Sequence, residues 1–226
     1  MIHTARITGA GYLGLAVFGM LGFLIVRPQI FASNDANATL ANLVANPGLA
    51  QLGIALELLI VIAQSVAAAG FFALFLRDRP AAGFAVATFG MANAVVILGS
   101  AGLLSAALAV SGDASLAPGN DAAGTAQLLL SLSAIAWNVG GIFFGLWLIP
   151  MGWFALSTGR FPRVLGYFLV VGGLGYVLSA ILSTAVPQVP SLVSNLLTMP
   201  ATIGELWMVG YLLIIGIRPT LTAGEH

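Results

Sequence analysis

Long apolar stretches take up most of this chain of 226 residues and constrain its fold more than any other feature. A helix needs about 20 consecutive apolar residues to cross the hydrocarbon core of a bilayer. Charged residues make up only 6% of the chain, whereas soluble domains carry about 25%. We therefore predict an all-α, polytopic integral membrane protein, a single transmembrane domain over residues 1–226 built as a bundle of six transmembrane helices. The predicted spans are 7–26, 51–76, 82–110, 124–155, 164–186 and 196–217.

Prolines and charges separate these spans, and both are expected to end a membrane-buried helix. They fall at Arg27-Pro28, Arg77 to Pro80, Arg160 to Arg163, and Arg218-Pro219. The fourth span is too long for one straight crossing, so we expect it to tilt or to project from the bilayer. Pro150 is expected to kink this span near its end.

Arginine placement predicts the orientation of the spans, because cytoplasmic loops carry an excess of basic residues. A cytoplasmic N-terminus puts every arginine except Arg27 on the inside and leaves Asp35, Asp113 and Asp121 in the outer loops. We predict a multi-pass protein of the cytoplasmic membrane with both termini cytoplasmic. The lysine-free, Ala-, Gly- and Arg-rich composition indicates a GC-rich bacterial genome, and we therefore expect the bacterial inner membrane. The first span is about twice as long as a signal-peptide core, so we expect it to be retained as an anchor.

The first outer loop, residues 28–50, is expected to contain a short helix on the membrane surface. Ser33 or Asn34 can cap its start, and Pro47 ends the pattern. Its apolar face would consist of Ala36, Leu40, Leu43 and Val44. The helix would bridge two spans or act as a lid over an outward cavity.

Two acidic residues fall inside the spans, Glu57 in the second and Glu205 in the sixth. Each lies only a turn or two below the predicted outer surface, and Arg27 ends the first span on that side. Because the three residues share one depth on one side, we expect them to form a cluster. A buried acid is costly in a bilayer and is therefore a functional candidate. The alternative is structural: one glutamate pairs with Arg27 and the other reaches the interface.

Weaker polar stripes on the same helices extend this candidate site. The candidate ligand-binding residues are Glu57, Glu205, Arg27, Gln64, Asn93, Asn138, Tyr176 and Trp207. Residues three, four or seven apart share a helical face, so the stripes should point into the bundle and line a polar pocket that opens outward. Alternatively, the polar and small residues are helix-packing contacts.

Several chemistries find no support in the sequence. There is no cysteine, and His3 and His226 stand at the chain ends, so we predict no metal site. No glycine-rich phosphate loop with its lysine occurs, no Ser–His–Asp set lies within the spans, and we predict no cofactor. The formal net charge is zero, which gives no indication of a nucleic-acid partner.

Short segments throughout the chain carry a family resemblance. They are Ala5 to Gly9 with Tyr12, Asp35 to Thr39 with Asn42, Leu52 to Ile54, Phe143 to Leu146, Pro162 to Gly166, Gly173 to Tyr176, and Pro200 with Gly204 to Trp207. On these segments the chain resembles the bacterial integral membrane proteins of domain-of-unknown-function family 4386 over nearly its whole length. The resemblance implies a multi-span membrane protein and supplies no activity. The usual leucine before the Pro-Arg pair is Phe161 here, and the usual glycine–tyrosine after the fourth span reads Gly152-Trp153.

Our leading functional hypothesis is binding of a small or lipophilic molecule in the outward pocket near Glu57 and Glu205, for transport or sensing. An intramembrane acid–base enzyme acting on a lipid or isoprenoid is one alternative, although we favour a non-enzymatic role and assign no catalytic residue. A non-catalytic subunit of a membrane complex is the other. The expected partners are the lipid bilayer, a lipophilic small molecule, and a second copy or another membrane protein.

Overall fold

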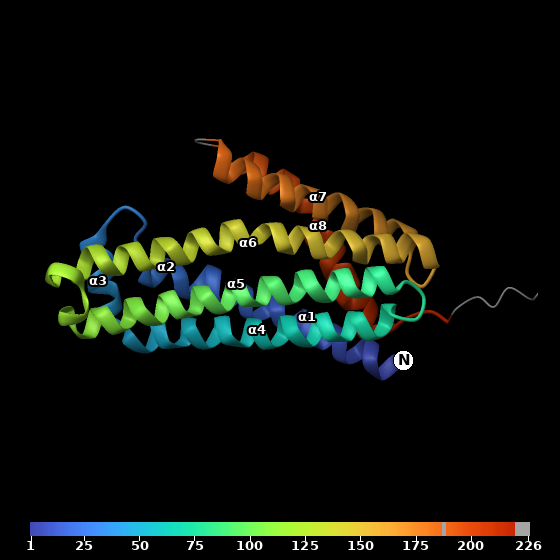
Figure 1. The fold of residues 1–226 in the computed structure, drawn as a ribbon, viewed down its shortest axis with the longest axis horizontal. Helices are drawn as coiled ribbons and strands as arrows, with labels where there is room; N and C mark the ends of the chain where they lie inside the picture. The colour runs from blue at the N-terminus through green and yellow to red at the C-terminus, as the bar shows by residue number, and fades with distance from the viewer. Residues whose placement is uncertain (187–188, 220–226) are drawn as a thin grey trace, which may run out of the picture. The chain divides into compact units, whose positions relative to one another are not determined.

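The computed structural model describes residues 1–186 and 189–219 (Figure 1), so His226 lies outside the described residues. Within those residues the secondary structure is helical, with no strand. Six described helices are long and apolar enough to cross a membrane: Ile2–Ile30, Pro47–Phe75, Pro80–Gly112, Ala122–Thr158, Arg163–Ala185 and Leu192–Ile214. The predicted all-α, six-span class is confirmed.

The first span continues past the position where the sequence predicts its end. It consists of α1 (Ile2–Met20), a π-helical segment η1 (Leu21–Val26) and α2 (Arg27–Ile30). The backbone N–H of Arg27 donates to the carbonyl of Gly22, five residues earlier. This wider turn changes the hydrogen-bond register directly before Pro28, whose ring has no N–H to donate. Arg27 is therefore held inside the helix rather than after it.

The short helix expected in the first loop is α3 (Ala36–Ala45). Its cap is Asp35, whose Oδ1 accepts from the Ala38 N–H at 2.9 Å; the prediction that Ser33 or Asn34 caps it is wrong. The predicted apolar face is only partly correct, because Leu43 is fully buried whereas Val44 is exposed. A polar residue, Thr39, anchors the helix by donating to Gln127 Oε1 at 2.6 Å.

The remaining spans are α4 (Pro47–Phe75), α5 (Pro80–Gly112), α6 (Ala122–Thr158), α7 (Arg163–Ala185) and α8 (Ser191–Ile214). Pro150 lies inside α6 and Pro200 inside α8. Two short 3-10 turns, η2 (Ala114–Leu116) and η3 (Pro118–Asn120), separate α5 from α6. Hydrogen bonds from Ser115 hold the pKa of the Asp113 carboxyl before η2 below its usual value.

The chain forms two compact units, and the first four spans contribute to both. The first unit comprises the described parts of Met1–Leu13, Ala63–Asn93 and Val139–His226. The second comprises Gly14–Ile62 and Ala94–Asn138. Each unit holds one of the two acidic residues that the sequence places inside spans, Glu205 in the first and Glu57 in the second.

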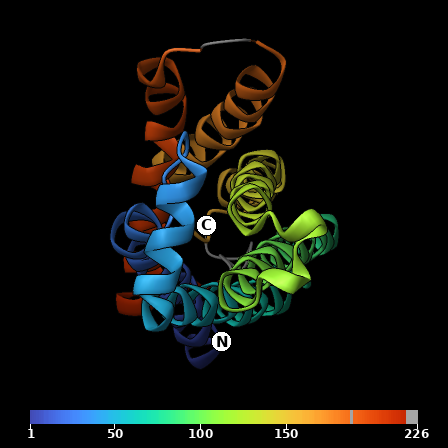
Figure 2. The same ribbon diagram turned by 90° about the vertical axis from the view of Figure 1, so that its left-hand side faces the viewer.

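Helices α7 and α8 (Figure 2) pack against each other within the first unit, and glycines lie in their contact. A Cβ added at Gly172 would overlap the backbone of Ala201, and one at Gly175 would overlap the carbonyl oxygen of Leu197. Such close backbone approach is the usual role of small residues between membrane helices. The core of the second unit is aliphatic and includes Val26, Ile30, Leu43, Leu56, Leu104 and Leu130.

Candidate functional site

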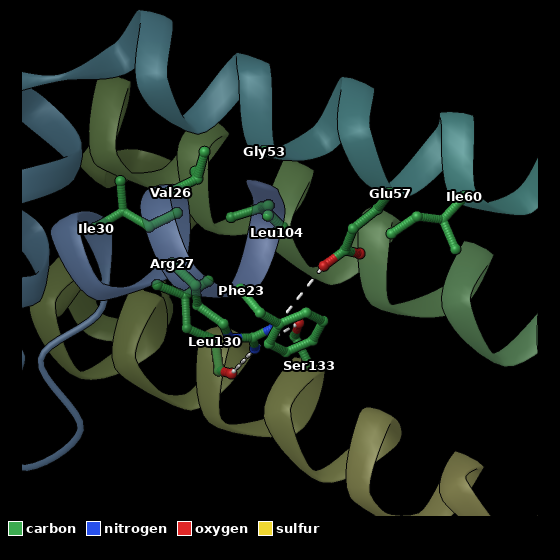
Figure 3. Close-up of a pocket in the computed structure, with 11 residues that line it drawn as sticks. Phe23, Val26, Arg27, Ile30, Gly53, Glu57, Ile60, Leu104, Leu130 and Ser133 are labelled. Atoms are coloured by element: carbon green, nitrogen blue, oxygen red, sulfur yellow. Dashed lines mark hydrogen bonds and ion pairs between the residues drawn. The ribbon is translucent and has the colours of Figure 1, made fainter. Parts of the chain in front are cut away.

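A pocket in the second unit contains an ion pair between the first span and α4 (Figure 3). Nη1 of Arg27 lies 3.7 Å from Oε1 of Glu57, and the two side chains are 16% and 8% exposed. This distance is longer than a good hydrogen bond, so the two groups attract each other as charges. Arg27 reaches the pocket because it follows directly on the π-helical segment η1, and such segments often occur at functional sites.

The guanidinium of Arg27 is oriented by α6. Its Nη2 donates to Ser133 Oγ at 2.9 Å and to the carbonyl of Leu130 at 3.3 Å. Its Cζ also lies 5.5 Å from the centroid of the Phe23 ring, within range of a cation–π interaction. Two α6 contacts and one ring therefore hold Nη2 in place, while Nη1 has the looser contact with the carboxylate.

The carboxylate of Glu57 is only half satisfied. Its Oε1 accepts from Trp137 Nε1 at 3.3 Å, and the Trp137 ring meets Phe23 edge to face at 4.6 Å. Its Oε2 is buried and has no hydrogen-bond donor among the described residues. The side chain of Ser100 also interacts with the Glu57 carboxylate, and its hydroxyl is 2.7 Å from Ser133 Oγ. A buried charged oxygen without a protein donor is rare, and such an oxygen can accept a hydrogen bond from a bound molecule.

The walls of this pocket are mostly apolar, and its polar groups are Arg27, Glu57 and Ser133. The centres of water-sized molecules can occupy about 20 Å³ of this pocket, and the empty space including its opening is about 380 Å³. Gly53 permits α4 to approach the first span closely at this pocket, because an added Cβ would lie 3.0 Å from Val26 Cγ1. Apolar walls with a few convergent polar groups are typical of small-molecule sites.

Glu205 has a different environment, in the first unit. Tyr12 of α1 donates from its hydroxyl to Oε1 of Glu205 at 2.7 Å. The Tyr12 ring is buried and meets Phe71 and Trp147 edge to face at 5.8 and 5.2 Å. Of the expected cluster, the structure brings Arg27 and Glu57 together. The described contacts of Glu205 are instead with Tyr12 and, electrostatically, with Tyr176.

The other candidate residues are distributed as follows. Asn93 Nδ2 donates to Gln64 Oε1 at 3.5 Å in the buried part of the first unit, where Gln64 Nε2 has no hydrogen-bond partner in the described part of the chain. Trp207 is 38% exposed and its ring lies 6.4 Å from that of Phe168. Asn138 is exposed on α6.

Three residues that complete these sites are not among the candidate residues predicted from the sequence. They are Ser133 and Trp137 beside Glu57, and Tyr12 beside Glu205. Ser133 and Trp137 are four residues apart on α6 and so share one face, which was a detectable signal. Nothing in the spacing showed which neighbour this face meets. No group of three or more His, Cys, Asp or Glu within the described ranges could hold a metal ion.

The comparison with protein families gives one finding. The model of a family described as "Domain of unknown function (DUF4386)" matches residues 7–216, so the predicted resemblance is confirmed. Neither the search of curated proteins nor the search of solved structures finds a match.

Proposed function

The chain belongs to the DUF4386 family, and we propose that it binds a small or lipophilic molecule in the pocket of Arg27 and Glu57, in the service of transport or sensing. The observation that carries this proposal is Glu57 Oε2, a buried carboxylate oxygen for which the described part of the chain supplies no donor in hydrogen-bonding geometry, in the wall of an apolar pocket beside a guanidinium. A ligand that donates one hydrogen bond to Oε2 removes this deficit.

The chemistry of the pocket restricts the ligand. An unmet hydrogen bond at a buried charged oxygen costs about 1–3 kcal/mol or more, so a ligand hydroxyl or amide N–H is favoured there. Nη1 of Arg27, which lies 3.7 Å from Glu57 Oε1, can donate to an acceptor oxygen of the same ligand. The aliphatic walls favour an apolar body behind this polar group. The ligand class is therefore an amphiphile with a neighbouring donor and acceptor.

We place the protein in the cytoplasmic membrane of a bacterial cell, with both termini in the cytoplasm. The arginine distribution supports this orientation, since Arg6, Arg77, Arg79, Arg163 and Arg218 would all lie on the inner side. Arg27 and Glu57 would then lie in the outer half of the first and second spans, so the pocket would receive its ligand from the outside or from the outer leaflet.

The test compares molecules that co-purify with the protein. Wild type, Glu57→Gln and the matched control Glu205→Gln are purified in the same mild detergent, and organic extracts of each are compared by mass spectrometry. We expect at least one species to fall about tenfold or more in Glu57→Gln, equivalent to about 1.4 kcal/mol, and to remain in Glu205→Gln. Size-exclusion chromatography verifies that each variant is folded. Identical extracts from wild type and Glu57→Gln would refute the proposal.

A further inference from the structure

We propose that the Tyr12–Glu205 pair is a proton-binding site made of different residues from the ligand pocket. The Glu205 carboxyl takes up and releases a proton inside the membrane-spanning part of the chain, and the hydroxyl of Tyr12 donates a hydrogen bond to it at 2.7 Å. The proposal does not depend on the ligand of the pocket described above.

The charge balance of the chain supports a mobile proton at Glu205. Glu57 has a fixed positive partner in Arg27, and Asp78 has one in Arg160, whose Nε donates to Asp78 Oδ2 at 2.7 Å. Among the described residues, no basic side chain pairs with Glu205. An ionised carboxylate in apolar surroundings is strongly disfavoured without compensation. A proton on the carboxyl is the simplest positive charge that can compensate Glu205.

The partners of Glu205 make both protonation states possible. The ionised carboxylate accepts the short, charge-assisted hydrogen bond from Tyr12. In the protonated state, Oε1 still accepts from Tyr12 and the proton resides on Oε2. The titratable groups that face Glu205 in the described chain are the phenols of Tyr12 from α1 and Tyr176 from α7. Neither phenol supplies positive charge, so the carboxyl itself is the group that exchanges the proton.

Glu205 is only partly buried on α8. Ala201 and Met208, which share its helical face, are buried, and the exposed apolar side chains Ile203, Leu206 and Trp207 lie on the other faces. Tyr12, in contrast, is 2% exposed and fixed between aromatic rings. A small apolar reagent dissolved in the bilayer or detergent can therefore approach the carboxyl, while the phenol that orients it stays in place.

Dicyclohexylcarbodiimide provides the test, because this membrane-soluble reagent adds to a protonated carboxyl and leaves a stable adduct that retains all its atoms. The purified chain is treated at several pH values between about pH 5 and about pH 9, a range that covers strongly perturbed carboxyls. Peptide mass spectrometry then measures the labelled fraction at Glu205 and at Glu57. We expect labelling of Glu205 that falls about tenfold per pH unit on the alkaline limb, as for a single titrating group. Glu57, held beside Arg27, should label at least several-fold more slowly.

Two variants and one ion complete the experiment. Glu205→Gln should abolish the carbodiimide adduct at this position. Tyr12→Phe should increase labelling at neutral pH, because the ionised carboxylate loses the hydrogen bond that stabilises it. The proposal is overturned if Glu205 does not react while Glu57 does, or if its labelling is independent of pH. If added sodium chloride protects Glu205 from labelling at constant pH and choline chloride does not, the site binds a sodium ion instead of a proton. That result would also overturn the proposal.

Discussion

Neutralising Arg27 and Glu57, singly and together, tests whether their charges interact in the folded protein. The variants are Arg27→Gln, Glu57→Gln and the double replacement. Glutamine keeps a polar side chain at both positions and removes the charge. Each single variant leaves one buried charge without its partner, whereas the double variant leaves none. The four proteins therefore form a double-mutant cycle for the ion pair.

The size of the effect follows from the geometry of the pair. Two unit charges 3.7 Å apart attract each other by about 4 kcal/mol at an effective dielectric constant near 20. Much of this is offset by the loss of hydration. Arg27→Gln leaves Glu57, the less exposed partner, without an opposite charge. It should destabilise the folded protein by about 3 kcal/mol. Glu57→Gln should cost about 2 kcal/mol, because Arg27 keeps its hydrogen bonds to Ser133 and Leu130.

The double variant should be destabilised by only about 2 kcal/mol, which gives a coupling energy of about 3 kcal/mol. The measurement is equilibrium unfolding in mixed micelles, with SDS as the denaturant and tryptophan fluorescence as the signal. The chain has four tryptophans, and one of them, Trp137, donates to Glu57, so the signal includes a contribution from the pocket. Additive effects, within about 0.5 kcal/mol, would show that the two charges do not interact and that our reading of the pocket is wrong.

Two further predictions concern packing and orientation. Gly175→Ala should destabilise the folded protein by about 2 kcal/mol or more, because the added Cβ would overlap the carbonyl of Leu197. Gly99→Ala adds a Cβ that faces open space and should leave the stability unchanged. SDS titration measures the stability of both variants. The chain has no cysteine, so Asn37→Cys and His3→Cys each carry a single thiol. A membrane-impermeant maleimide added to whole cells should label the first and not the second, and the reverse pattern would contradict the proposed orientation.

The six spans could be predicted because length and hydropathy alone determine them, whereas their ends could not. Arg27-Pro28 has the residues of a helix stop, yet the helix continues through them after a π-helical turn. The first loop offers three adjacent residues that can cap a helix, and Asp35 does so. Local sequence permits each of these outcomes, and packing around the segment selects one.

The candidate site could be predicted only as far as single helices allow. Periodicity shows that Glu57 and Gln64 share a face of α4, but not that the first meets Arg27 and the second Asn93. Nor could it show that Glu205 has a tyrosine as its partner. Which helical faces meet depends on packing between segments far apart in the chain, such as Tyr12 with Glu205, and one sequence does not carry that information.

The two intramembrane acids differ in what neutralises them. Replacement by glutamine should therefore have different effects at Glu57 and at Glu205. At Glu57 the carboxylate balances Arg27, so an amide leaves a net positive charge in a buried place and destabilises the fold. At Glu205 no basic residue of the described chain is paired with the acid, so an amide reproduces the neutral, protonated state and can still accept from Tyr12. A carboxyl whose neutral form is well accommodated, and whose ionised form retains one strong donor, has the properties that reversible protonation requires.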